Sequence, residues 1–306
     1  MKKKLRWGLV GYGKAAKNFY NTFDTNLSSE LVSISTKSKY DEISCNFKNL
    51  EIYKNYEDQI QSNKIDIIYI SLINPLHKKL MELGIKYNKH IVIEKPSCLS
   101  FFDLNIVISK IKNINSSYGF NFAKKKFFFF KRKKKYEENI FNKNLGGGAI
   151  YNYAHYPLSA VNIFSQNQKP KNSKIIKCKS FIGHTGVDEF SNIILEFDNG
   201  IKSNITVAIN KNLKSFIEII GSKGKIFINN PWVPNQSFSF NVYLSNKSEK
   251  EFIFNSIRSM WSYEIESIEN DIFNNKLISS TAGANLEDSC FYLKQIDKWR
   301  SQVYNK

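Results

Sequence analysis

Apolar and polar residues alternate along the first third of the chain in a rhythm that predicts parallel strands separated by helices. β-Branched and large apolar residues run together at residues 5–10, 31–36, 65–73 and 90–93, which predicts strands. Apolar residues recur at helical spacing over residues 14–24 and 76–88. The run 65–73 is apolar at most positions, as is typical of a parallel strand covered on both faces. The pattern is a βαβ repeat and predicts a doubly wound parallel sheet.

After about residue 170 the rhythm changes to longer extended segments joined by turns. Turn chemistry is supplied by Asp198-Asn199-Gly200 and by the Gly-Ser-Lys-Gly segment at 221–224. We expect the strands to form one open, mostly antiparallel sheet, and they are predicted at residues 174–182, 190–197, 201–209, 215–220, 225–229, 238–244 and 251–254. Two helices are predicted to finish the chain, at 261–275 and 283–304.

This change of rhythm predicts two domains in an α/β chain. The first covers residues 1–120 and is doubly wound, and the second covers residues 121–306 and is an α+β domain with the open sheet. The last helix can pack back on the first domain. A length of 306 residues agrees with two domains of roughly 150 residues each, enough to build cores without disulfides or metals.

The composition is strongly basic, with 45 Lys and Arg against 27 Asp and Glu and a formal net charge of +18. Only four of the basic residues are arginine, whereas surfaces that grip phosphates usually use arginine forks as well as lysines. We therefore interpret the charge mainly as lysines spread over a solvated surface, and nucleic acid is not the expected partner.

Neither a membrane protein nor a metal protein is indicated. No run approaches the roughly 18 apolar residues of a membrane span, and no apolar stretch follows the N-terminal lysines as in a signal peptide, so we expect a cytoplasmic protein without membrane contact. The four cysteines and four histidines are scattered, without the paired spacing of a disulfide framework or a zinc site.

The first predicted strand runs directly into Gly11-Tyr12-Gly13-Lys14-Ala15-Ala16, which has the pattern G-x-G-x-x-A. Two glycines allow a tight turn and let the backbone approach a pyrophosphate at the N-terminus of the following helix. The motif stands at the first strand-to-helix junction of a βαβ unit, the context that supports a dinucleotide site. Gly11, Gly13, Lys14 and Ala15 are thus predicted to bind cofactor.

The end of the second strand bears on the choice between NAD and NADP. NAD-selective sites commonly place Asp or Glu there, on the ribose hydroxyls, but this chain has Ser35-Thr36-Lys37-Ser38. Lys37 and Ser38 can contact a 2′-phosphate, which favours NADP over NAD. The alternative is that Lys37 is one more surface lysine.

Further along, Glu94-Lys95-Pro96 follows the strand at 90–93, at the edge where open α/β sheets bind ligands. Together with the glycine motif, this segment resembles the Gfo/Idh/MocA oxidoreductases. The resemblance covers almost the whole chain, because it resumes at Ile-Asn-Pro-Leu-His (73–77), at Gly-Gly-Gly-Ala-Ile-Tyr-Asn-Tyr-Ala-His-Tyr-Pro (146–157), at residues 218–226 and at Pro231-Trp232. The family's usual proline is absent at Ile73.

The resemblance implies a Rossmann domain, hydride transfer between nicotinamide and a sugar-like alcohol or carbonyl, and a homodimer or homotetramer. It assigns Ser71, Asn74, His77, Glu94 and Lys95 to the cofactor region. It also makes Lys95 a catalytic residue, and a cation beside the reacting oxygen would stabilise charge and help relay the proton. Partial desolvation would lower the pKa of such a lysine.

The resemblance places further site residues on the predicted helix 149–164. Many relatives carry Asp and His four residues apart there, one helical turn, where this chain has Asn152 and Tyr156. One branch of the family has Tyr-Pro at the later position, so Tyr156 is assigned as proton donor or acceptor, with Asn152 and His155 as substrate contacts. Asn152 can bind a hydroxyl but cannot be a base, and His155 lies about 100° around the helix from Tyr156.

The segment 121–136 departs most from the family, with a run of three lysines, four consecutive phenylalanines and then five basic residues ending at Lys135. It is interpreted as a packed strand and short helix with solvated lysines, as a clamp for a phosphate-bearing substrate such as a nucleotide-sugar, or as a nucleic-acid or membrane contact. Two alternatives to the dehydrogenase therefore stay open: a dinucleotide-binding relative without turnover, and a protein that binds an anionic polymer.

Overall fold

The computed structural model describes residues 4–23, 28–109, 138–165, 172–232, 237–258, 260–276 and 285–305. It divides into two compact units. One consists of Met1–Phe120 with Trp261–Asp297, and the other of Asn121–Met260 with Lys298–Lys306. The basic segment 121–136 lies outside the described residues, so its three interpretations stay open.

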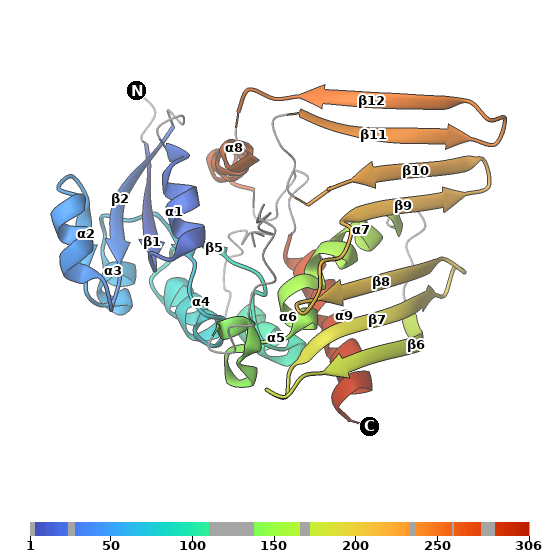
Figure 1. Ribbon diagram of the computed structural model, residues 1–306. Helices are drawn as coiled ribbons and strands as arrows, with labels where there is room; N and C mark the ends of the chain where they lie inside the picture. Colours follow the sequence, from blue (N-terminus) through green and yellow to red (C-terminus); the bar gives the residue numbers. More distant parts are fainter. Residues whose placement is uncertain are drawn as a thin grey trace. The chain divides into compact units, whose positions relative to one another are not determined.

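The first unit contains a five-stranded parallel sheet with the strand order β3-β2-β1-β4-β5 (Figure 1). Its strands are β1 (Leu5–Val10), β2 (Ser29–Ser35), β3 (Glu51–Tyr53), β4 (Ile67–Ile70) and β5 (His90–Ile93). Between and after them lie α1 (Lys14–Tyr20), α2 (Tyr40–Asn46), α3 (Tyr56–Gln61), the 3-10 turn η2 (Asn74–Leu76), α4 (His77–Lys86) and α5 (Phe101–Ser109). The predicted doubly wound sheet is confirmed, and the central position of β1 puts a switch of strand order between β1 and β4.

Burial on both faces holds this sheet together. Every residue of β4 is buried, and Trp7 and Leu9 of β1 have no exposed surface. Arg6 fixes the start of β1 beside Asp66 through two side-chain hydrogen bonds, Nε to Oδ2 at 2.9 Å and Nη2 to Oδ1 at 2.7 Å, and its backbone N–H also donates to Oδ2 at 3.0 Å. β4 ends at Ile70, earlier than the predicted 65–73, because the chain turns at Ser71 and enters η2 at Asn74-Pro75.

The structure differs from the predicted domain boundary near the C-terminus. Helix α8 (Met260–Phe273), from Trp261 on, belongs to the first unit and not to the second domain of residues 121–306. Most of α9 (Leu286–Tyr304) also belongs to the first unit, which agrees with the expectation that the last helix can pack back on the first domain. The indole of Trp261 contacts the ring of Phe19 edge-on, with centroids 5.7 Å apart, and Leu293 joins the core cluster around β4 and β5. Apolar burial is thus the reason that these helices return to the first unit.

The second unit holds antiparallel strands, as predicted, but in two sheets. One has the order β6-β7-β8, and the other β12-β11-β10-β9 (Figure 1). The strands are β6 (Ser173–Ile182), β7 (Asp188–Phe197), β8 (Lys202–Ala208), β9 (Phe216–Gly221), β10 (Gly224–Asn229), β11 (Ser237–Leu244) and β12 (Glu249–Asn255). The predicted antiparallel α+β domain is confirmed, with its strands divided between two sheets: after Ala208 only Ile209 extends the pairing, through its N–H to Glu189 O, and no ladder between the described strands joins β8 to β9.

The predicted helix 149–164 is also divided. The described chain passes through the 3-10 turns η3 (Asn139–Phe141) and η4 (Lys143–Leu145), then α6 (Ala149–Tyr153) and α7 (His155–Ser165). The break lies at Ala154, where Pro157 has no N–H to give to the carbonyl of Tyr153. Ala154 itself keeps right-handed helical dihedral angles, with φ of −67° and ψ of −26°, so between Asn152 and Tyr156 the division amounts to one lost helical hydrogen bond.

Asp188 anchors the start of α6 from β7. Its Oδ2 accepts a hydrogen bond from the N–H of Ile150 at 2.7 Å, and its Oδ1 accepts one from the Tyr304 hydroxyl at 2.7 Å. Gly148 precedes the helix with φ of 112°, and a Cβ there would collide with the Asp188 carboxylate. A glycine is thus required at this point of the Gly146-Gly147-Gly148 run.

Candidate functional site

The glycine motif forms a backbone surface at the carboxyl end of β1. Gly11 has φ of 96°, and a Cβ on it would lie 2.6 Å from Leu72 Cδ2, so no side chain fits there. The Ser71 hydroxyl lies 3.4 Å from Gly11 O and donates to it. Gly13 is exposed and caps α1 without a side-chain hydrogen bond, and Lys14 and Ala15 begin that helix. Bare backbone at this junction fits a dinucleotide pyrophosphate.

The residues that follow β2 are polar and include the basic Lys37. Thr36 is buried, whereas Lys37 and Ser38 are exposed just beyond the strand. The Lys37 ammonium lies over the ring of Tyr56, 5.2 Å from its centroid. This end of the strand therefore presents a cation rather than a carboxylate.

His77 connects two of the predicted segments through backbone carbonyls. Its imidazole has no exposed surface, and Nδ1 lies 2.8 Å from Pro96 O while Nε2 lies 3.1 Å from Leu72 O. The resemblance assigned His77 to the cofactor region, but its polar atoms face the protein. His77 therefore bears on the cofactor region indirectly, because its ring holds the backbone at Leu72 and the backbone at Pro96. Ser71 and Asn74 on the same connection are partly exposed.

Glu94 and Lys95 stand at the carboxyl end of β5 in a largely desolvated setting. The Tyr69 hydroxyl donates to Glu94 Oε1 at 2.5 Å. Burial raises the pKa of the Glu94 carboxyl to about 7, while Tyr69 and Lys95 oppose that shift. Burial also lowers the pKa of Lys95, and the charge of Glu94 opposes it. A lysine with a lowered pKa can hold or release a proton nearer to neutral pH, as expected from the sequence.

The second unit carries the other predicted residues. Asn152 Nδ2 donates to Gly148 O at 2.7 Å, so this amide also braces the glycine-rich segment. Tyr156 is 6% exposed, and its ring lies 5.6 Å from the ring of Trp232 and 6.4 Å from that of Tyr153. His155 is also buried, at the first position of α7. Trp232 was named in the resemblance without a role, and the structure places it against Tyr156.

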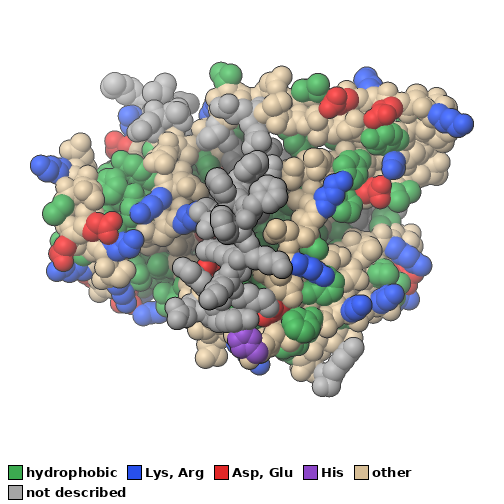
Figure 2. Space-filling view, viewed as in Figure 1, with side chains coloured by type: hydrophobic (Ala, Val, Ile, Leu, Met, Phe, Trp, Pro, Cys, Tyr) green, Lys and Arg blue, Asp and Glu red, His purple; other side chains and the backbone are tan. Residues whose placement is uncertain are grey.

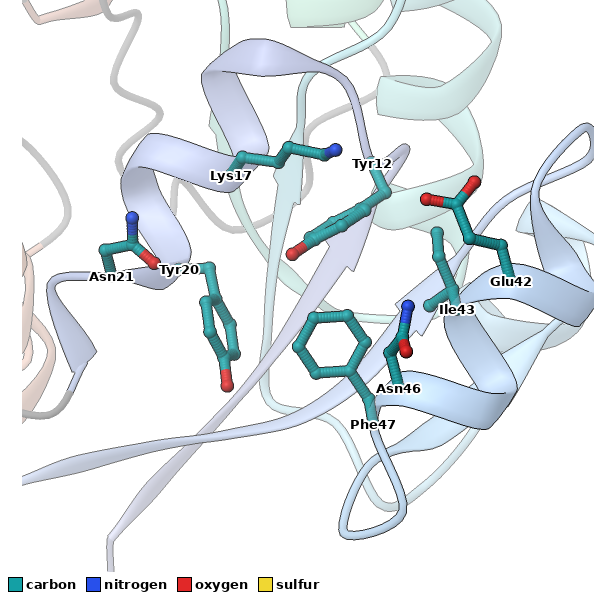
Figure 3. A pocket seen from close by; sticks show the side chains of 8 residues that line it. All are labelled: Tyr12, Lys17, Tyr20, Asn21, Glu42, Ile43, Asn46 and Phe47. Carbon is teal, nitrogen blue, oxygen red and sulfur yellow. The ribbon is translucent and has the colours of Figure 1, made fainter.

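A pocket of about 330 Å³ lies beside the glycine motif, and sequence reasoning did not find it. Figure 3 shows the ring of Tyr12 between the side chain of Lys17 and the ring of Phe47, with Glu42 on the facing helix. The centroids of Tyr12 and Phe47 are 5.4 Å apart, and those of Tyr20 and Phe47 are 5.1 Å apart. The aromatic residues in α1 and after α2 could have indicated this pocket from the sequence. They did not, because helix α2 itself was not predicted.

The described part of the chain shows how basic residues and potential metal ligands are distributed. Lys and Arg side chains are scattered singly and in small groups over the face shown in Figure 2. No cluster of His, Cys, Asp and Glu there could hold a metal, and all four cysteines are free. Among the described helices, none is both long and apolar enough to cross a membrane.

Comparison with known proteins identifies two family models along the chain. The model of the Gfo/Idh/MocA oxidoreductases with an NAD-binding Rossmann fold matches residues 5–121, and the model of the Gfo/Idh/MocA C-terminal domain matches residues 107–227. Among curated proteins, the chain is 22% identical over 273 residues to trans-1,2-dihydrobenzene-1,2-diol dehydrogenase of Xenopus tropicalis, covering 81% of this chain and 80% of that protein.

Two solved structures share the fold over nearly their whole length. A 3-ketoreductase from Actinomadura kijaniata, in complex with NADP and TDP-benzene, has a TM-score of 0.79 at 14% identity, with 98% of both chains covered. An aldose-aldose oxidoreductase from Caulobacter crescentus, complexed with glycerol, has a TM-score of 0.77 at 16% identity, with 99% of both chains covered. At these identities the likeness shows the fold alone.

The hydrogen bond from Tyr69 makes a prediction about Glu94. In Tyr69→Phe the carboxylate loses a donor, so the pKa of Glu94 should rise above about 7. Carbon-13 NMR of protein labelled at the glutamate carboxyl carbon measures that titration. Tyr20→Phe, which removes a hydroxyl elsewhere in the same unit, is the control. An unchanged or lower pKa in Tyr69→Phe would contradict the assignment.

Proposed function

Because this chain belongs to the Gfo/Idh/MocA family of NAD(P)-dependent oxidoreductases, we propose that it transfers a hydride between nicotinamide and a secondary alcohol or carbonyl. The proposed substrate is a sugar, a polyol or a nucleotide-sugar. The observation that carries the proposal is Lys95, held in a desolvated setting beside Glu94 at the carboxyl end of β5. This is the sheet edge at which open α/β folds bind their ligands.

The residues of the first unit fit a dinucleotide cofactor. Gly11 cannot carry a side chain, Gly13 is exposed at the start of α1, and both lie at the end of β1. When bound, nicotinamide would accept or supply the hydride. We assign Gly11, Gly13, Lys14 and Ala15 to the dinucleotide, with Lys37 and Ser38 at its ribose and Ser71, Asn74 and Glu94 in the nicotinamide region.

Two side chains are assigned to the chemistry. The Lys95 ammonium would stabilise the oxygen on which negative charge develops as the alcohol proton departs. The Tyr156 hydroxyl would give or take that proton, a role supported by its burial against Trp232. Asn152 and His155 would contact substrate hydroxyls. The second candidate, a dinucleotide-binding relative without turnover, rests on Asn152 in place of the family's acid.

Replacement of Lys95 tests the reaction. Lys95→Ala should lower kcat roughly 10²- to 10⁴-fold because the developing charge loses its cation, while nicotinamide fluorescence still reports cofactor binding. The wild-type rate should fall as pH rises through the pKa of Lys95, which burial lowers from 10.5. Lys86→Ala, at the end of α4, is the control.

Undiminished turnover in Lys95→Ala would overturn the assignment of Lys95. A wild-type protein that binds dinucleotide but neither oxidises nor reduces any member of a panel of sugars, polyols and nucleotide-sugars would favour the second candidate.

Lys37 supports NADP as the preferred cofactor. Removing a cation from a 2′-phosphate should cost about 1.4 kcal/mol, a tenfold loss of affinity, so Lys37→Ala should bind NADP about tenfold more weakly. Binding of NAD, which has no 2′-phosphate, should not change. Titrations of both cofactors by fluorescence measure the difference, with Lys48→Ala as the surface control. Equal losses for NAD and NADP would contradict the role of Lys37.

The sheet β9–β12 supports a homo-oligomer. One of its faces is apolar across all four strands, yet none of its large side chains is buried in the chain. This face consists of Ile217, Ile219, Ile226, Ile228, Phe238, Phe240, Val242, Phe252 and Phe254. Most of these side chains are half-buried and Phe254 is exposed, so a second copy of the chain would cover the apolar surface that remains open to solvent.

A charge at the centre of this apolar face should weaken the oligomer. Phe240 stacks on Phe252 with centroids 5.0 Å apart, so Phe240→Lys would place an ammonium within the face. Light scattering should then show a shift from dimer or tetramer to monomer. Asn241→Lys puts the same charge on the opposite face and is the control. A monomeric wild-type protein would contradict the proposal.

A further inference from the structure

Helix α8 carries an acid, the half-buried Glu264, on the side that packs within the first unit. Trp261, Ile265 and Ile268 are at most 6% exposed, and they form the side of the helix that packs within the first unit. Glu264 follows Trp261 by three residues and precedes Ile268 by four, so it lies on the same side. An ionisable residue at such a position needs an explanation.

The surroundings of Glu264 are negative rather than positive. Its Oε2 is buried and, among the residues that the structure describes, has no hydrogen-bond partner. The charged group that acts on it is the Glu94 carboxyl, and Glu264 acts in turn on Tyr69. Lys95 pairs electrostatically with Glu94. The cluster therefore contains two carboxyls, one phenol and one ammonium, drawn from β4, the end of β5 and α8.

Two carboxyls that interact in a desolvated cluster cannot both ionise without a large cost. Glu94 has a hydroxyl donor at 2.5 Å and a neighbouring ammonium, and both stabilise its anion. Burial and the charge of Glu94 raise the pKa of Glu264 well above its ordinary value, and no cation among the residues that the structure describes opposes that shift. The proton of the pair accordingly resides on Glu264.

We propose that Glu264 is a positioning residue of the active site: in the cluster with Glu94 its buried carboxyl keeps the proton and leaves the one negative charge of the pair on Glu94. Glu94 then serves as the counter-ion of Lys95, and the neutral Glu264 adds no second charge. Only the link from Lys95 to hydride transfer rests on the proposed function; the protonation of Glu264 stands independently of it.

Infrared spectroscopy of the cofactor-free protein tests the proton directly. At pH 8, where solvated carboxyls are ionised, the wild-type protein should show the C=O stretching band of a protonated carboxylic acid. The band should be lost in Glu264→Gln and kept in Glu266→Gln, whose residue is exposed on the same helix. Absence of the band in the wild type, or its survival in Glu264→Gln, would overturn the proposal.

Stability against pH is the second measurement. In the folded chain Glu264 keeps its proton to a higher pH than in the unfolded chain. Wild-type stability should therefore decline as pH rises above the ordinary pKa of 4.5, until the raised folded-state pKa is reached. In that range, the unfolding constant of wild type relative to Glu264→Gln should grow by up to about tenfold per pH unit.

The matched control and the activity separate this proposal from the proposed function. Urea unfolding of Glu266→Gln should follow the pH dependence of the wild type, and a Glu264→Gln curve parallel to both would overturn the proposal. If the protein turns over no substrate, the infrared band and the unfolding curves still decide the state of Glu264. If it does turn over, Glu264→Gln should also change the alkaline limb of the pH–rate profile.

Discussion

The removal of the Glu94 carboxylate from water is the constraint on which the first unit's site depends. A buried carboxylate requires a donor and a counter-ion, and Tyr69 and Lys95 supply them. The next residue, Pro96, is held by His77, which also reaches Leu72 O. The Leu72 side chain in turn lies where a side chain on Gly11 would have to be. One run of contacts thus joins the ends of β1, β4 and β5.

That run of contacts explains why some site residues were visible in the sequence and others were not. Gly11, Gly13 and Glu94-Lys95-Pro96 follow strands directly, so a local pattern was enough to place them at one sheet edge. Tyr69 lies inside a strand whose sequence is almost entirely apolar. Its role became visible only in the structure, where its hydroxyl donates to Glu94 Oε1. Glu264 lies far along the chain and meets Glu94 only through folding, although an acid on the apolar side of a predicted helix was a signal.

The errors of fold have equally local causes. Pro157 divides the predicted helix because it cannot donate to Tyr153 O, and a periodicity of apolar residues does not record a missing N–H. The two antiparallel sheets have the predicted strands, but the chain between Ala208 and Phe216 determines whether they join. On the one face that Figure 2 shows, Lys and Arg side chains are scattered and do not gather in a single patch.

Isotope transfer tests the central claim, hydride transfer to or from nicotinamide, most directly. Purified protein would be incubated with oxidised NADP and a panel of sugars and polyols deuterated at carbon, and the reduced dinucleotide analysed by mass spectrometry. The account predicts reduced dinucleotide that carries one deuterium with at least one member of the panel. Dinucleotide that binds but stays free of deuterium with every member would contradict it.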